Sequence, residues 1–251
     1  TGDEEGEAVD GTVAILDWMQ QNGEKIDHCL VGEPTSPSQM GEMMKIGRRG
    51  SMNAKITATG TQGHSAYPDR ANNPIVAMVK LLDKLESHQL DVGTEHFDPS
   101  TLAITSVDTG NKASNVIPAV TKAAVNIRFN DSHSGSSLVS WLKDEIEKVS
   151  AEYGIKFETD FKISGESFIT PPGELSDLIS EAVKKELGVT PKLSTTGGTS
   201  DARFIKDMCP VTEFGLVGKT MHAVDEKVET KQINQLKEIY YRILEAYFEK
   251  T

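Results

Sequence analysis

The sequence predicts an α/β domain that is interrupted by a smaller α+β domain inserted into it. In the first and last parts of the chain, patterns typical of helices and of buried strands alternate, which favours a layered α/β architecture. The middle part carries a complete pattern of its own, in the order strand, helix, strand, strand, helix, strand. A chain of 251 residues is long enough to bury one sizeable core or two modest ones.

The α/β domain is expected to consist of residues 1–50 and 164–251, with the N-terminal part of the domain missing. Apolar residues at helical spacing and short apolar runs define its elements. The predicted helices cover about residues 9–21, 175–187 and 233–248, and the predicted strands cover residues 29–32 and 211–214.

The inserted domain is expected to cover residues 51–163. Its first strand is predicted from an alternation of apolar positions, and its helices from apolar residues three and four apart. The strands are expected near residues 52–58, 101–107, 125–129 and 155–161, and the helices near 73–85 and 138–149. This split βαβ, or ferredoxin-like, arrangement leaves a strand edge and a helix face to be covered, which favours a dimerisation domain.

The charge of the chain excludes some partners. The formal net charge is -12, with 38 acidic against 26 basic residues. Nucleic acids and anionic membranes attract basic surfaces, so neither is an expected partner. No apolar run approaches the length of a membrane span, and the two cysteines show no paired spacing. We therefore expect a cytoplasmic protein.

Acidic residues and one histidine form a possible metal site in the α/β domain. Glu4 and Glu5 lie between glycines, Glu33 follows an apolar strand, and His222 lies after a glycine-containing loop. Glutamate and histidine residues that are separated in sequence are a common ligand set for zinc. Each feature alone is also typical of a solvated acidic turn, a turn acid or a surface histidine.

Five further positions have the chemistry of substrate contacts. Gly198 and Thr199 precede a predicted helix start, where backbone N–H groups can bind a carboxylate, although the pattern also fits an ordinary capped helix. His64 and Asn115 lie in short turns of the inserted domain. Arg48, at the junction of the domains, has a guanidinium suited to a substrate carboxylate or to a hinge.

In their order along the chain these segments resemble the two-domain, two-zinc aminoacylase and metallopeptidase family. The resemblance covers essentially the whole chain. It is carried by the motifs Asp3-Glu4-Glu5, Val31-Gly32-Glu33-Pro34, Gly47-Arg48-Arg49-Gly50-Ser51, Gly63-His64-Ser65-Ala66-Tyr67-Pro68, Asn115-Val116-Ile117-Pro118, Gly198-Thr199-Ser200-Asp201 and Met221-His222. It implies a homodimeric hydrolase that cleaves a linear amide of a small N-acyl amino acid.

The resemblance also implies roles for single residues. Glu4 matches a general base, and Glu5, Glu33 and His222 match ligands of two zinc ions per intact subunit, with cobalt or manganese as alternatives at one site. His64 matches an oxyanion donor that acts in the partner subunit.

The remaining matched positions are contacts to the substrate. Asn115 matches a second residue contributed across the dimer, while Arg48, Arg128 and Thr199 match residues that hold substrate carboxylates.

The family's other two metal ligands, a histidine and a bridging aspartate, have no match in this sequence. We therefore expect a fragment that binds zinc weakly and is inactive alone. Two hypotheses remain open, a fragment of a hydrolase and a noncatalytic dimerisation or binding module of the same ancestry. Whether the acyl group is succinyl or acetyl also stays open.

Overall fold

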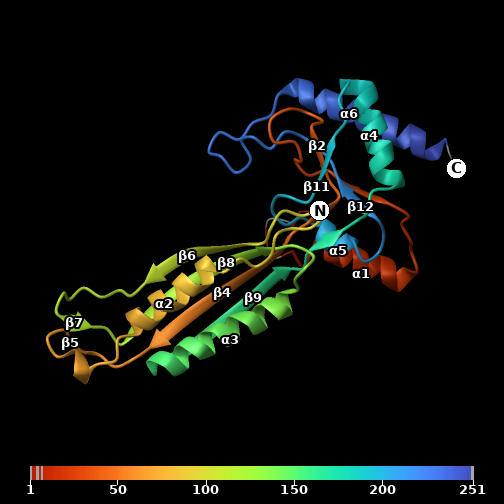
Figure 1. Ribbon diagram of the computed structural model, residues 1–251. Coiled ribbons are helices and arrows are strands. Elements are labelled where there is room, and N and C mark those ends of the chain that lie inside the picture. The colour runs from red at the N-terminus through yellow and green to blue at the C-terminus, as the bar shows by residue number, and fades with distance from the viewer. Residues whose placement is uncertain (1, 4–5, 7, 250–251) are drawn as a thin grey trace. The chain divides into compact units, whose positions relative to one another are not determined.

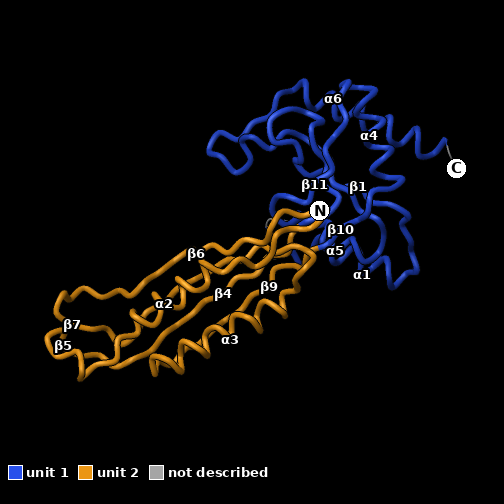
Figure 2. Tube along the Cα trace, in the orientation of Figure 1, with its two compact units in different colours: residues 1–48, 168–251 blue, residues 49–167 orange. Residues whose placement is uncertain are grey.

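The structure is a computed structural model that describes residues 2–3, 6 and 8–249. The chain divides into two compact units, one formed by residues 1–48 and 168–251 and the other by residues 49–167 (Figure 2). None of the helices within the described residues is long and apolar enough to cross a membrane.

The first unit is built on a four-stranded mixed sheet with the strand order β1-β12-β2-β11. β1 pairs with β12 in parallel, β2 pairs with β11 in parallel, and β12 and β2 are antiparallel. Its strands are β1 (Cys29–Val31), β2 (Met43–Lys45), β11 (Lys192–Ser194) and β12 (Val211–Glu213), with β3 (Gly47–Arg48) and β10 (Phe168–Ile169) forming a separate antiparallel pair. Its helices are α1 (Thr12–Asn22), α4 (Glu174–Leu187), α5 (Ala202–Ile205) and α6 (Thr230–Phe248).

The core of the first unit lies between α4, α6 and the sheet. Ile179 and Val183 of α4 are four residues apart, so they share one face of the helix and are fully buried. They pack with Met44 of β2 and Ile239 of α6 in one apolar cluster. The helices therefore hold the strands whose ends carry the candidate site residues.

The second unit contains a four-stranded antiparallel sheet with the strand order β6-β8-β4-β9 and two helices (Figure 1). Its elements follow in the order β4 (Gly50–Thr59), α2 (Pro74–Ser87), β6 (Thr101–Asp108), β8 (Val120–Phe129), α3 (Gly135–Tyr153) and β9 (Lys156–Gly165). Two short strands, β5 (Gly63–His64) and β7 (Val116–Ile117), pair apart from this sheet, and a 3-10 turn, η1 (Pro68–Arg70), follows β5.

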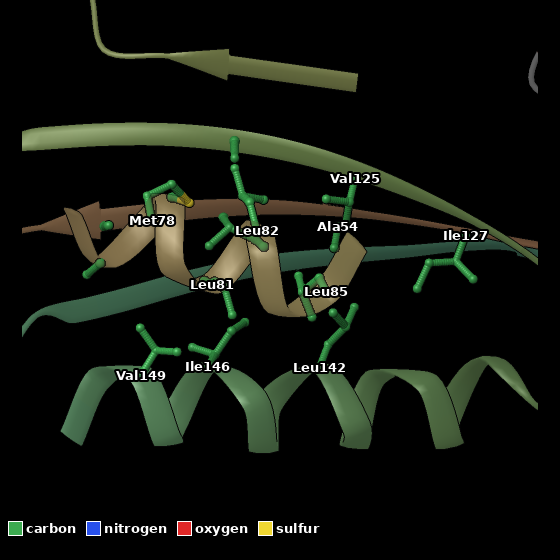
Figure 3. Packing of buried hydrophobic residues seen from close by; sticks show 14 of the residues in the cluster. Ala54, Met78, Leu81, Leu82, Leu85, Val125, Ile127, Leu142, Ile146 and Val149 are labelled. Atoms are coloured by element: carbon green, nitrogen blue, oxygen red, sulfur yellow. The ribbon is translucent and has the colours of Figure 1, made fainter. Parts of the chain in front are cut away.

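The periodicity of each element determines which side chains form the core of the second unit. Along β4, alternate side chains are buried against the helices, whereas the intervening Asn53 and Lys55 are exposed. Figure 3 shows Leu81 of α2 pointing toward Ile146 and Val149 of α3. Within the described residues, all the members of this apolar cluster belong to residues 49–167.

Local signals set the ends of the helices. The side chain of Asn73 accepts a hydrogen bond from the backbone of Ile75 (3.0 Å) and caps α2, which begins with Pro74. Ser134 and Ser137 form a reciprocal capping pair at the start of α3. The first helix begins at Thr12, after Gly11, and not at the predicted residue 9.

Several short elements lie outside the expected set. β2 and β11 have only three residues, and β3, β5, β7 and β10 have two. Segments of this length show no periodicity, so pairing with distant strands determines their structure.

Candidate functional site

The ends of two parallel strands bring Glu33 close to the loop that carries His222. β1 and β12 are adjacent and parallel, so the chain leaves both strands at the same edge of the sheet. The two exit segments continue side by side, because the backbone N–H of Gly218 donates to the carbonyl of Ser36 (3.0 Å). A Cβ atom on Gly215 would lie 2.4 Å from the carbonyl oxygen of Glu33, so only glycine allows this approach.

His222 has an unusual backbone conformation. Its φ is +60°, in the left-handed region that non-glycine residues seldom adopt. The loop around it is closed by Thr220, whose hydroxyl donates to the carbonyl of Lys227 (2.8 Å) and accepts from its N–H (3.0 Å). The N–H of His222 donates to the carboxylate of Glu226 (3.2 Å). Such backbone conformations concentrate at functional sites, which supports His222 as a site residue.

The predicted base and one predicted ligand, Glu4 and Glu5, lie outside the described residues. Next to them in sequence, the carboxylate of Asp3 accepts hydrogen bonds from the backbone N–H groups of Val9 (2.6 Å) and Asp10 (2.9 Å).

Within the described ranges, no three His, Cys, Asp or Glu side chains are grouped as a metal site. Glu33 and His222 alone are fewer than the three or four protein ligands of a zinc site. The third predicted ligand, Glu5, lies outside the described residues, so the zinc site stays a prediction.

Arg48 forms an ion pair with Glu213, a residue that the sequence analysis did not identify. Its Nε donates to both carboxylate oxygens of Glu213, at 2.9 and 3.1 Å, and its Nη2 forms an ion pair with Oε2. The hydroxyl of Ser200 donates to Oε1 of the same carboxylate (2.6 Å). The one signal in the sequence is that Glu213 is a charged residue inside the apolar run of β12. We call Arg48, Ser200 and Glu213 the Glu213 cluster.

Lys45 of β2 borders the Glu213 cluster. Its Nζ donates to the hydroxyls of Thr196 (2.8 Å) and Ser194 (3.3 Å). Burial and the nearby Arg48 lower the pKa of Lys45 to about 8, with Lys192 adding to the decrease and Glu213 opposing it.

The segment with Gly198 and Thr199 is a loop that precedes a short helix. α5 begins only at Ala202 and has four residues, so it offers no extended helix start for a carboxylate. Gly198 is exposed and Thr199 is half-buried, next to the fully buried Ser200. Their role as substrate contacts stays a prediction.

In the second unit, the structure brings His64 and Asn115 together. β5 and β7 pair so that His64 is opposite Val116, and the N–H of Ser65 donates to the carbonyl of Asn115 (2.9 Å). The Nδ1 atom of His64 accepts a hydrogen bond from the N–H of Ala66 (3.0 Å). In a neutral imidazole this leaves the proton on Nε2, which makes that nitrogen a hydrogen-bond donor. We call His64 and Asn115 the His64 turn, and both residues are exposed.

Arg128 lies on β8 opposite Ser51 of β4. Burial and the charge of Arg49 lower the pKa of Arg128, so a second guanidinium is close by in the same unit. The Nε atom of Arg49 is buried and has no hydrogen-bond partner among the described residues. Two neighbouring guanidinium groups attract an anion such as a carboxylate.

Two cavities of the described residues do not contain the predicted site residues. One of about 500 Å³ lies in the first unit beside β1 and α6, and one of about 520 Å³ lies on the sheet of the second unit, along β4 and β8. The lining of the first includes Gly32, the neighbour of Glu33 in sequence, but neither lining includes a predicted catalytic, metal-binding or substrate-binding residue.

The comparisons with known proteins identify a dimerisation domain in the middle of the chain. Residues 46–154 match the family model of the peptidase dimerisation domain. The chain is 66% identical over 248 residues to a succinyl-diaminopimelate desuccinylase of Ruegeria pomeroyi and 65% identical to one of Cereibacter sphaeroides. Each alignment covers 99% of this chain and 65% of the relative, so the chain spans about two thirds of the length of the curated relatives it matches.

Solved structures show the same fold at low sequence identity. An aminopeptidase PepT from Bacillus cereus has a TM-score of 0.75 at 16% identity, over 94% of this chain and 61% of that one. A tripeptidase from Staphylococcus aureus has a TM-score of 0.76 at 19% identity, over 93% of this chain and 60% of that one. The sequence comparisons agree with the resemblance found in the motifs, because residues 46–154 match the peptidase dimerisation domain and the chain is similar to succinyl-diaminopimelate desuccinylases along 99% of its length.

Proposed function

We propose that this chain is part of a metal-dependent amide hydrolase that cleaves N-succinyl-L,L-2,6-diaminopimelate into succinate and L,L-diaminopimelate. The observation that carries the proposal is the 66% identity along 99% of the chain to a protein named for this reaction. The reaction would serve lysine and cell-wall precursor synthesis in the cytoplasm, with the substrate as a small-molecule partner. Zinc is the proposed metal, with Glu5, Glu33 and His222 as ligands on this chain.

The proposed roles of the other residues follow their chemistry. Glu4 would accept the proton of the attacking water, as a general base does. Arg128, next to the partly unbonded Arg49, would hold a substrate carboxylate. Arg48 would contribute through Nη1, the guanidinium nitrogen that Glu213 does not bind, while Gly198 and Thr199 would contact the substrate from the loop.

The proposed catalytic role of His64 is to stabilise the oxyanion of the tetrahedral intermediate. Support comes from the hydrogen bond between Ala66 N–H and Nδ1, which leaves Nε2–H to donate to a negative oxygen. Both residues of the His64 turn are exposed, which suits a group that is offered to another subunit. We propose a homodimer formed through an inserted domain of residues 51–163 with the ferredoxin-like arrangement, and Asn115 as the second residue given to the partner.

The reaction is tested with the protein that the complete reading frame encodes, supplied with zinc. It should release succinate from N-succinyl-L,L-2,6-diaminopimelate at least about 100-fold more efficiently than acetate from N-acetylornithine, because a guanidinium site rejects an acyl group without a carboxylate. Comparable rates on both substrates would assign a broader deacylase. Absence of hydrolysis in the zinc-loaded protein would favour the noncatalytic module.

A matched pair of variants tests the carboxylate contact. Arg128→Met should raise the KM for the succinylated substrate, whereas Lys122→Met removes one positive charge from an exposed position on the same strand and should leave it unchanged. Equal effects would mean that only the overall charge of the strand matters.

A further inference from the structure

The carboxylate of Glu213 joins two segments that are far apart in sequence. It accepts hydrogen bonds from Arg48, 165 residues away, and from Ser200, which precedes α5. Glu213 is 1% exposed, Arg48 is 7% exposed and Ser200 is fully buried. A carboxylate this deeply buried needs a cation and hydrogen-bond donors, and Glu213 has both.

Glu213 is linked to both ends of the loop formed by residues 196–200, through Arg48 at one end and Ser200 at the other. Ser200 is bonded at the C-terminal end of the loop. At the N-terminal end, Nη1 of Arg48 donates to the carbonyl of Thr196 (3.4 Å). A Cβ atom on Gly197, whose φ is +110°, would lie 2.3 Å from that nitrogen. The loop therefore lies directly on the guanidinium that Glu213 orients.

The charges around the loop make Glu213 necessary. Lys45 is 6% exposed and Arg48 is 7% exposed, so two cations are buried around one carboxylate. Removal of the carboxylate would leave the two cations facing each other in a medium that screens them poorly. The repulsion would act on Thr196, which accepts hydrogen bonds from both side chains.

We propose that Glu213 is a positioning residue that fixes the loop of residues 196–200, and with it Gly198 and Thr199, in the conformation that binds substrate. Glu213 acts through Arg48 and Ser200 and does not itself touch the substrate. The substrate part of this inference rests on the proposed function, whereas the fixing of the loop is a property of the first unit alone.

Hydrogen exchange of this 251-residue chain without substrate tests the fixing of the loop. Glu213→Gln keeps the size of the side chain and removes its charge, and it should speed exchange in residues 196–201 about tenfold or more, because hydrogen bonds to charged groups are lost. Thr212→Val is the matched control, since Thr212 is buried on the same strand and its hydroxyl has no partner among the described residues. Thr212→Val should leave the rate of hydrogen exchange in residues 196–201 unchanged.

Two outcomes would overturn the proposal. One is unchanged exchange in residues 196–201 of a folded Glu213→Gln protein, and the other is an equal increase throughout the first unit, which marks general loosening only. If Glu213→Gln does not fold, the same exchange measurement is made on Ser200→Ala. This variant removes the hydrogen bond between Ser200 and Glu213 and keeps the ion pair between Glu213 and Arg48. Faster exchange in the loop alone supports the proposal, and no local change contradicts it.

A second measurement separates positioning by charge from packing. In an NMR titration of lysine side chains, with Lys45 assigned by Lys45→Met, the pKa of Lys45 should be lower in Glu213→Gln than in the unchanged chain, because Glu213 raises it. Glu213→Asp should restore part of the difference. An unchanged pKa of Lys45 in Glu213→Gln would mean that the Glu213 carboxylate does not affect the protonation of Lys45.

In the protein that the complete reading frame encodes, Glu213→Gln should raise KM more than it lowers kcat, because it disorders a binding loop and leaves the reacting groups in place. A fall in kcat with unchanged KM would contradict the substrate part of the inference and leave the exchange result standing. If the proposed function itself is wrong, the unchanged protein will not turn over the proposed substrate. That outcome is distinct from any effect of Glu213→Gln on hydrogen exchange.

Discussion

The Glu213 cluster and the His64 turn fix their side chains in opposite ways. In the Glu213 cluster, every side chain is buried and bonded to another member. In the His64 turn, the two side chains are exposed, and backbone hydrogen bonds hold the segment. A group that acts within its own domain can be preorganised by buried partners, whereas a group offered to another subunit must stay at the surface. The free energy of unfolding should therefore depend strongly on the side chains of the Glu213 cluster and little on those of the His64 turn.

The largest effect is expected for Glu213→Leu. It leaves Arg48 buried without its counter-ion, which should lower the free energy of unfolding by about 3–5 kcal/mol. Urea unfolding followed by circular dichroism measures the change. Thr212→Val, on the same strand, should be neutral or stabilising, because it replaces a buried hydroxyl that is unbonded among the described residues. A loss below about 1 kcal/mol for Glu213→Leu would show that the ion pair contributes little.

The next effect is expected at the loop above Arg48. Gly197→Ala places a side chain at φ +110° and 2.3 Å from Nη1 of Arg48, which should lower stability by about 1–3 kcal/mol. Gly198→Ala is the control, since a Cβ there would contact nothing within 4 Å and its change should stay within about 0.5 kcal/mol. The same urea titration compares the two, and equal losses would mean that the loop does not rest on Arg48.

A smaller effect concerns the pH dependence of stability. Burial and Arg48 lower the pKa of Lys45 to about 8 in the folded chain, against about 10.4 when unfolded. Between these values the unfolded state binds more protons, so stability should rise with pH from about 8 to about 10.4. The groups that act on Lys45 are Arg48, Glu213 and Lys192. Lys45→Met should reduce this rise, and an identical pH profile would place Lys45 in contact with water.

The smallest effect on stability is expected in the His64 turn. His64→Ala should change the free energy of unfolding by less than about 0.5 kcal/mol, because the side chain is exposed. In the protein that the complete reading frame encodes, the same change should reduce turnover about 100-fold or more, as loss of one oxyanion donor does, with metal content unchanged. A large loss of stability with little loss of turnover would assign His64 a structural role.

The two regions also differ in what their sequences predict. The alternation of Met52, Ala54 and Ile56 was enough to identify β4, because a strand with one buried face repeats every two residues. The Glu213 cluster has no such signal, since its partners are 165 residues apart and meet only through the sheet. The pairing of β5 with β7 likewise depends on tertiary structure, so motifs suggested His64 and Asn115 singly but not their proximity. The metal site stays a prediction, because Glu4 and Glu5 lie outside the described residues.

The most direct test of the account is complementation between two inactive variants of the protein that the complete reading frame encodes. Glu4→Gln lacks the proposed base and His64→Ala lacks the proposed oxyanion donor, and each alone should be inactive or nearly so. If the exposed His64 acts in the partner subunit, a mixed dimer contains one site with an intact Glu4 and a borrowed His64. Mixing should then restore part of the turnover. No recovery of turnover, when mass spectrometry shows that subunits have exchanged, would contradict a role for the His64 turn across the dimer.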